Sequence, residues 1–306
     1  MLTFLRRRLF QGLISILIVL SIAFVVLNLS GDPIRMMLPP TASQEDVEAM
    51  RKSYGFDQPL IYRYFTFLNQ IAHLDFGKSV QTRRPALSMV LARLPATILL
   101  SFSALFLAAL FGIPLGILAA VKRGKIVDTL AVLLSMVGQS TPVFWIALIL
   151  IYLFGVIFPV LPPSGYGTAE HLILPATSLS LFLLAGITRV TRTSLLEVLN
   201  MPFITTARSK GLKEHVVILK HAFLNAVIPV VTQLALQMRF VIGGSVVVEA
   251  IFGWPGLGQL LAQAAFARDY PVVITSTFFI SLFIILLNIA LDCFYSAINP
   301  RIKLWE

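Results

Sequence analysis

The sequence contains a single cysteine, Cys293, and only 12% charged residues among its 306 positions. One cysteine can form neither an intramolecular disulfide nor a cysteine metal cluster, and Cys293 lies in an apolar segment as a small hydrophobic residue would. Hydrophobic residues make up 58% of the chain, well above the roughly 45–50% of soluble domains. The composition therefore predicts an integral membrane protein.

The chain also lacks a recognisable nucleotide-binding motif. The segment Ala72-His-Leu-Asp-Phe-Gly-Lys-Ser79 comes close to a phosphate-binding P-loop, but position 72 is not glycine and no strand is expected before it. The glycines at 253, 256 and 258 do not form a dinucleotide fingerprint, because they follow an apolar helix. If the chain takes part in ATP-driven chemistry, the ATP must be bound elsewhere.

Positive charge exceeds negative charge, with 24 Lys and Arg against 14 Asp and Glu. Nucleic-acid binding is not indicated, because the basic residues flank apolar segments, where they meet lipid head groups and set orientation. Arg6, Arg7 and Arg8 precede an apolar run of about 21 residues, 9–29, which spans about 31 Å as a helix. No small-residue cleavage site follows, so residues 1–30 are predicted to be an uncleaved anchor with a cytoplasmic N-terminus.

Residues 31–93 are then predicted to form an extracytoplasmic insert with two short helices. Ser43 can cap the first helix, with Glu45 and Asp46 in its first turn. Pro59 can open the second helix, in which apolar residues recur close to helical spacing.

Residues 94–306 are predicted to form an all-α core that raises the number of spans to six, with both termini cytoplasmic and no internal repeat. The apolar stretch 126–160 is too long for one straight crossing and is interrupted at Gly138-Gln-Ser-Thr-Pro142. It forms either two spans, or one span from about Val143 preceded by an interfacial or re-entrant piece. The positive-inside rule favours one span, because it keeps six later basic residues in the cytoplasm. The other core spans are expected at 94–121, 172–190, 226–248 and 272–297.

The longest water-compatible run in the second half is Ile204–Asn225, within a predicted cytoplasmic loop at about 191–225. Gly211 divides it, and glycine is suited to a turn with positive φ. The run predicts two short helices that form a compact knob. Spacing alone also fits a basic amphipathic segment held by anionic lipid.

The residues of this run resemble the cytoplasmic coupling loop of permease subunits of binding-protein-dependent ABC importers. That signature reads Glu-Ala-Ala, three residues, Gly, nine residues, Ile-x-Leu-Pro. Ala207 and Gly211 match it, whereas Thr205 replaces the glutamate and His221-Ala-Phe-Leu replaces the last motif, as in the peptide and nickel branch. The resemblance implies that this loop contacts an ATPase, through residues Thr205, Thr206, Ala207, Arg208, Gly211, Leu212 and His221.

A second segment, Glu249–Gly258, resembles another hallmark of peptide-type permeases. Under the predicted topology it lies on the outer side of the membrane. Its members are candidates for an outer loop or gate: Gly253, Trp254, Pro255, Gly256 and Gly258. Short segments around Gly55–Pro59 and Asp75–Gly77 resemble the extracytoplasmic region of the same permeases.

No catalytic or metal site is predicted. The four histidines fall on both sides of the membrane, and no serine has a paired histidine and acid. Polar groups within spans are the better indication of function, since an ionisable group costs several kcal/mol at the bilayer centre unless it faces protein or water. Gln139, Ser140, Thr141, Arg239 and Glu249 are candidates for a water-filled pathway, although Arg239 and Glu249 could instead form structural pairs.

The resemblance implies a type I ABC importer permease fold and a transport role without enzymatic activity. It further implies a second homologous permease, two cytoplasmic ATPase subunits that bind ATP and Mg, and an extracytoplasmic solute-binding protein, in a bacterial or archaeal plasma membrane. No cofactor is expected on this chain. Peptides are the first expectation for cargo, with glutathione, nickel chelates, opines or oligosaccharides as alternatives. A secondary carrier is the rival class, which the scarcity of intramembrane acids disfavours.

Overall fold

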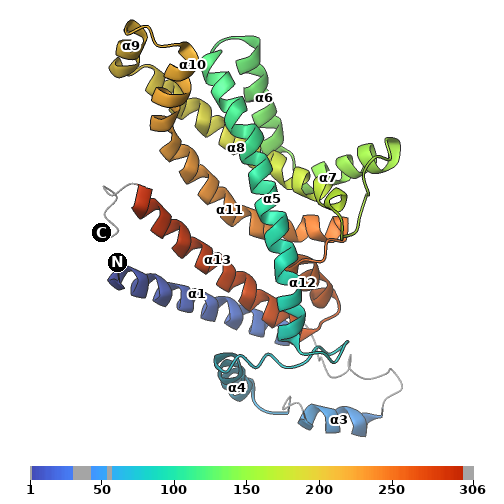
Figure 1. The fold of residues 1–306 in the computed structure, drawn as a ribbon. Helices are drawn as coiled ribbons and strands as arrows, with labels where there is room; N and C mark the ends of the chain where they lie inside the picture. The colour runs from blue at the N-terminus through green and yellow to red at the C-terminus, as the bar shows by residue number, and fades with distance from the viewer. Residues whose placement is uncertain (1, 30–42, 54–56, 299–306) are drawn as a thin grey trace. The chain divides into compact units, whose positions relative to one another are not determined.

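The computed structural model describes residues 2–29, 43–53 and 57–298. The described residues are almost entirely helical, apart from turns and one isolated bridge between Lys78 and Pro85 (Figure 1). The chain divides into two compact units. The first comprises residues 1–95 and 256–289, and the second comprises residues 96–255 and 290–306. The division falls within helix α5, Ala86–Val121.

The first unit is built around α1, Leu2–Leu29, and α13, Tyr270–Ile298. Gly12 of α1 lies so close to Ile285 that an added Cβ would come within 2.6 Å of its side chain. α4, Leu60–Ala72, packs on α1 through Leu20, Phe24 and Phe67. α12, Leu257–Phe266, adds Leu257 and Leu260 to a neighbouring apolar cluster.

The two predicted helices of the insert are present. α3, Gln44–Ser53, begins after Ser43, whose hydroxyl accepts from the amide of Asp46 and donates to the Asp46 carboxylate at 2.7 Å. The hydroxyl and the amide of Ser43 both donate to this carboxylate, which favours its charged form and lowers the pKa of Asp46. α4 begins after Pro59, as predicted. Gly55, at the expected end of α3, lies outside the described residues.

The segment that comes close to a P-loop does not have P-loop geometry. Gly77 has φ +72°, but its amide is occupied by Oδ1 of Asp75 at 3.1 Å. The following residues form a turn, and the next helix begins only at Ala86. Ser79 instead donates to the buried Asp269, which also accepts from the amide of Val80 at 3.1 Å. The segment is therefore a structural tether within the first unit.

The second unit contains the remainder of α5 together with the other core helices. Its main apolar cluster joins α5, α7, α8 and α11 through residues such as Leu100, Ala147, Leu183 and Val248. The elements in chain order are α6 Ile126–Ser140, α7 Val143–Ile151, the π-helical η1 Tyr152–Ile157, α8 Ala169–Leu199, α9 Pro202–Ser209, α10 Glu214–Val216, the π-helical η2 Val217–Phe223 and α11 Leu224–Phe252.

The interruption predicted at Gly138–Pro142 is present. α6 and α7 with η1 meet at an angle of 102°, with Thr141 and Pro142 between them. Neither piece alone reaches the length of a span, and the bend gives the apolar stretch the form of a broken span or a re-entrant loop. In the described residues, five helices are long and apolar enough to cross a membrane, and up to seven elements qualify if each of two bent pairs is one span.

Two helices extend beyond the spans expected from the apolar runs. α8 continues to Leu199, nine residues beyond the expected end of its span, so residues 191–199, the start of the predicted coupling loop, are helical. α5 begins at Ala86, before the expected start at 94. In both places polar and basic residues continue the helix, because backbone hydrogen bonding does not require an apolar sequence. The side of the membrane on which each terminus lies remains a prediction.

Small residues allow α5 and α8 to cross closely. A Cβ added to Gly116 would lie 2.7 Å from the carbonyl oxygen of Thr188 and 2.6 Å from Cβ of Thr191. One turn earlier on α5, the carbonyl of Gly112 accepts a hydrogen bond from the Thr188 hydroxyl at 3.2 Å. In lipid, where apolar burial does not drive helix association, such close backbone packing is a main source of stability.

We expect Gly116→Ala to destabilise the protein by about 1–3 kcal/mol, because the new methyl group meets the backbone of α8 and not a flexible side chain. The measurement is the fraction of detergent-solubilised protein that remains monodisperse after heating. Gly243→Ala on α11 is the matched control, since a Cβ there meets nothing within 4 Å. Equal melting of the two variants would show that the α5–α8 crossing can relax.

Candidate functional site

α9 forms the tip of the predicted coupling loop and is sharply delimited at both ends. Met201 is extended and Pro202 occupies the first helical position, where its missing amide hydrogen is not needed. The helix ends at Lys210, and Gly211 turns the chain with φ +76°. The amide of Gly211 donates to the carbonyl of Arg208 at 2.9 Å. The predicted glycine turn is confirmed.

Two side chains of α9 anchor it to the rest of the second unit. Ile204 is completely buried, and Ala207 is 8% exposed. They share an apolar cluster with Ala120 at the end of α5 and Leu195 in the last turns of α8. The other buried members come from α8, η2 and α11: Val198, Val217, Ile218, Ala222 and Ala226. α9 is thus packed directly against the ends of long helices and does not hang from a free loop.

Most of the other predicted coupling residues are exposed at the surface of α9 and of the turn that follows it. Thr205, Thr206, Arg208, Gly211 and Leu212 are exposed. Figure 1 shows α9 and α10 at the same end of the second unit as the turn between α5 and α6. Ala207, by contrast, faces the apolar cluster and cannot contact a partner while α9 keeps this packing.

An ion pair closes the turn at Gly211. Arg208 donates from Nη2 to Glu214 Oε1 at 2.7 Å, and the hydrogen bond raises the pKa of Arg208 above its usual value. Both side chains are about half exposed, at 46% and 55%. Exposed pairs of this kind contribute little to folding, so the bridge mainly sets the orientation of the turn.

The second short helix of the predicted knob is not a separate element. After Gly211, α10 passes into η2 and then into α11 without a break. His221 is half-buried on η2, and its carbonyl accepts from the Asn225 side chain at 2.6 Å. Residues 214–223 therefore continue into α11 as one helical stretch. This stretch has both exposed and buried side chains.

A partly buried ion pair that was not predicted from the sequence lies close to this site. Arg192 of α8 binds the Asp128 carboxylate of α6 with both arms, from Nε at 2.5 Å and Nη2 at 2.9 Å. Asp128 also accepts from the amide of Gly124 at 3.0 Å, so it joins the α5–α6 turn to α8. A carboxylate in the first turn of a helix after a basic turn was the available signal, because acids favour helix N-termini.

The candidate pathway residues near the helix break lie at the surface of this chain. Gln139 and Ser140 are exposed at the end of α6, and Thr141 is half-buried. The Thr141 hydroxyl donates to the carbonyl of Val137 at 2.7 Å, which ties its polar atom to the helix end. Gly138 approaches α8 closely, with the carbonyl of Leu181 3.0 Å from where its Cβ would be.

Two candidate pathway residues, Arg239 and Glu249, lie on α11. Glu249 has no exposed surface, and its Oε1 accepts from the Thr97 hydroxyl of α5 at 2.8 Å. This geometry favours the structural pair over the open pathway for Glu249. The side chain of Arg239 lies outside the described part of the structure.

The segment after α11, predicted to be an outer loop or gate, is held in place by Trp254. Gly253 ends α11 with φ +62°, and Trp254 is 1% exposed. Its Nε1 donates to the carbonyl of Ala96 at 2.9 Å, and its ring lies edge-on to Tyr166, with centroids 4.7 Å apart. Pro255 is half-buried beside it. In the first unit, Gly256 caps α12, and Gly258 is buried in the first turn of that helix.

No three potential metal ligands among His, Cys, Asp and Glu come together in the described residues.

Comparison with known proteins yields consistent matches along the chain. The family described as "Binding-protein-dependent transport system inner membrane component" matches residues 112–304, and the N-terminal family of the same membrane components matches residues 1–101. The glutathione transport system permease protein GsiC of Escherichia coli K12 is 39% identical over 294 residues, which cover 95% of this chain and 96% of that protein. The protein of the same name from Salmonella paratyphi A is 38% identical over 304 residues, 99% of each chain.

Solved structures match the fold. A chain of the MetNI methionine ABC transporter in an inward-facing conformation superposes with TM-score 0.58 and 21% identity, over 70% of this chain and 98% of that chain. An amino acid ABC transporter crystallised with histidines gives TM-score 0.54 and 17% identity, over 69% and 94% of the two chains.

We expect Asp128→Ala to lower the free energy of unfolding by about 2 kcal/mol or more, because it leaves Arg192 without its carboxylate. Fully buried pairs cost about 3–5 kcal/mol when broken, and the Arg192 side chain is 25% exposed. Thermal unfolding of the purified protein measures the loss. The double variant Asp128→Ala/Arg192→Met should recover part of it. A double variant no more stable than Asp128→Ala would contradict the assignment of the cost to an uncompensated charge.

Proposed function

The chain belongs to the family of binding-protein-dependent transport system inner membrane components, and from that premise we propose that α9 is the handle through which an ATPase drives this subunit. The whole chain is a multi-pass permease subunit of an ABC importer. The sequence contains no ATP-binding motif, so the ATP and Mg are bound by two partner ATPase subunits in the cytoplasm. A second homologous permease and an extracytoplasmic solute-binding protein complete the proposed assembly.

The observation that carries the proposal is the burial of one face of α9 combined with the exposure of the other. Ile204 and Ala207 lock the helix to the ends of α5 and α8, and the exposed face presents Thr205, Thr206 and Arg208. A force applied to the exposed face is therefore carried to long helices by side chains already in contact. Packed apolar groups transmit displacement because interiors are close-packed and have low compressibility.

The helices that receive this displacement pack closely on each other. α8 and α11 share an extensive helix–helix contact. α11 continues directly from η2, and only residues 200 and 201 separate α8 from α9. Movement of α9 consequently shifts both helices together, and the Asp128–Arg192 pair adds α6 to the moving group. Closing and opening of the ATPases would in this way alternate the pathway between outward and inward states.

The pathway itself is proposed to pass the polar break between α6 and α7. Gln139 and Ser140 are exposed there, at the end of the largely apolar helix α6. Irregular backbone at membrane depth is tolerated only against protein or water. The partner permease or a water-filled path would meet that requirement. Arg239 remains a candidate for the same pathway, and Glu249 has the lesser claim because of its burial.

The proposed cargo is a small peptide. The observation in favour is the identity of 39% to permeases named for glutathione, which is itself a tripeptide. The proposed cargo therefore includes glutathione. Nickel chelates, opines and oligosaccharides are less favoured as cargo. The solute-binding protein supplies most of the selection in such an assembly.

Mass spectrometry of the proteins that copurify with this chain in mild detergent tests the assembly. The expected composition is this chain, a second homologous permease and the ATPase subunits. Recovery of the chain alone, under conditions in which a control ABC complex stays intact, would favour a secondary carrier and contradict the proposal.

We expect Gly211→Val to reduce ATP-dependent uptake at least about tenfold while leaving membrane insertion intact. A β-branched residue is disfavoured at φ +76°, and the left-handed conformation costs about 1–2 kcal/mol even for ordinary residues. Uptake per ATP hydrolysed, in proteoliposomes, is the measured quantity. Gly211→Asn should retain most of the uptake, because asparagine tolerates this conformation.

Gly77→Val is the matched control for backbone strain. Gly77 has φ +72° and, like Gly211, has open space where a Cβ would lie, but it belongs to the loop after α4 in the first unit. If Gly77→Val lowers the coupling ratio as much as Gly211→Val, the effect comes from general strain and not from the handle.

A further inference from the structure

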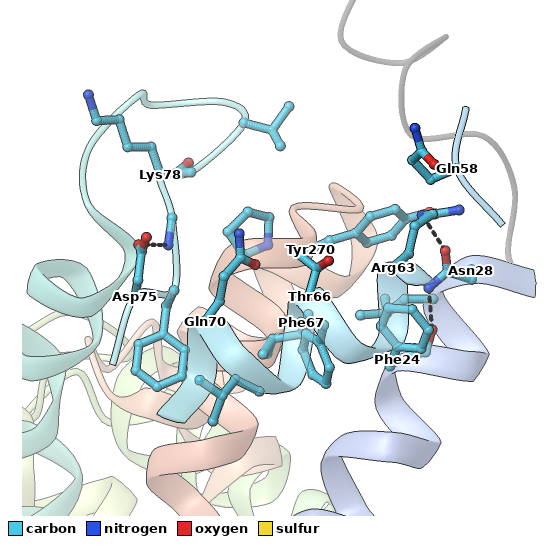
Figure 2. Close-up of a pocket in the computed structure, with 18 of the residues that line it drawn as sticks. Phe24, Asn28, Gln58, Arg63, Thr66, Phe67, Gln70, Asp75, Lys78 and Tyr270 are labelled. Carbon is cyan, nitrogen blue, oxygen red and sulfur yellow. Dashed lines mark hydrogen bonds between the residues drawn. The ribbon is translucent and has the colours of Figure 1, made fainter. Parts of the chain in front are cut away.

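The first unit contains a cavity of about 480 Å³ that the transport function does not use. It is bounded by the last turns of α1, by α4, by the loop from Asp75 to Arg83 and by the first turn of α13 (Figure 2). All of these segments belong to the same unit. The volume lies within the roughly 300–1,000 Å³ of ligand sites in proteins.

The floor of the cavity is apolar and aromatic. Phe24 of α1 and Phe67 of α4 are 6% and 9% exposed, and their ring centroids are 4.9 Å apart. Phe76 from the loop and Ile274 from α13 are also part of the apolar lining. A small hydrophilic anion would gain nothing from such a floor, whereas a hydrocarbon chain would.

The rim of the cavity is polar and carries net positive charge. Its charged members are three cations, Arg63, Lys78 and Arg83, and one carboxylate, Asp75. Arg63 donates to Oδ1 of Asn28 at 2.5 Å, which holds its guanidinium at the end of α1. Asp75 is turned toward the backbone of its own loop, where it accepts from the amide of Gly77. The charge balance favours an anionic group at the rim.

The position of the cavity in the chain places it at the end of a membrane span. Residues 6–28 of α1 are long and apolar enough to cross a bilayer, and Phe24 and Asn28 lie in its last turns. Val25 and Val26, in the same turns, are 44% and 53% exposed, as expected of a surface that faces lipid. The cavity therefore adjoins apolar surface that continues along α1.

α4 supports an interfacial location. One of its faces packs on α1, while Ile61, Tyr62 and Phe65 are each at least 60% exposed. A short helix with exposed aromatic and aliphatic side chains is typical of the membrane–water interface, where tyrosine is enriched.

We propose that this cavity binds one anionic phospholipid of the adjoining leaflet, with an acyl chain on the Phe24–Phe67 floor and the phosphate at the cationic rim. The apolar lining accounts for the chain, the excess of cations accounts for the charge, and the continuity with α1 provides the route of entry. The inference depends on α1 being a span and is independent of the cargo.

The assay uses the intact transporter complex in nanodiscs that contain phosphatidylcholine with a minor fraction of phosphatidylglycerol. Native mass spectrometry after gentle detergent release counts the phosphatidylglycerol retained on this subunit. We expect one retained phosphatidylglycerol per subunit and no comparable retention of phosphatidylcholine. Equal retention of the two lipids would overturn the proposal.

Two variants alter the cavity in different ways. Lys78→Gln with Arg83→Asn removes two rim cations, and asparagine suits the positive φ of position 83. Each lost cation should weaken retention about fivefold. Thr66→Trp fills the space above α4, where Thr66 points toward the cavity in Figure 2. It should abolish retention without changing the charge.

The control is Arg51→Gln with Lys52→Gln in the last turn of α3, an equal loss of charge outside the cavity lining. Retention should be unchanged in this variant. Each variant is compared only as an assembled complex, judged by size-exclusion chromatography. Loss of retention in the α3 control, or undiminished retention in both cavity variants, would overturn the proposal. Displacement of the lipid by inorganic phosphate at millimolar concentration would also overturn it, because the apolar floor would then have no part in binding.

Discussion

The close approach of helices through small residues is the constraint on which the second unit depends. Within lipid, apolar burial does not hold helices together, so direct packing and internal hydrogen bonds must do so. Gly116 permits the backbone of α8 to reach α5, and Gly186 of α8 leaves room for the amide groups of Gln233 and Gln237 on α11. These contacts pack the helices closely against one another. Close-packed helices have low compressibility, so they can transmit a displacement along their length.

Two kinds of contact hold the helix ends near α9. Apolar packing through Ile204 joins α9 to the ends of α5 and α8. The Asp128–Arg192 pair has a defined geometry and joins α6 to α8 in one register. The exposed Arg208–Glu214 bridge belongs to a different class, because solvent screens it.

Much of this arrangement could be predicted from the sequence because the relevant signals are local. Long apolar runs define spans, Ser43 and Pro59 begin helices, and glycine at 211 turns the chain, each by a mechanism that acts within a few residues. Other features depend on residues far apart in sequence. The partners of Asp128 and Glu249 lie 64 and 152 residues away, and no local pattern identifies them. The continuation of α8 beyond its apolar run, to Leu199, is not evident from hydropathy, because hydropathy reports the solvent preference of side chains and not the hydrogen bonding of the backbone.

The π-helical segment η2, Val217–Phe223, has a consequence for how the knob and the fifth span are phased. A π turn contains about one residue more than an α turn, and one residue corresponds to about 100° of rotation. Its presence between α10 and α11 fixes which faces of the two helices share a direction. Val217 and Ala222 can thereby face the α9 cluster while Val230 and Val241, farther along α11, are also buried. The segment therefore fixes the rotation of α11 about its own axis relative to α10.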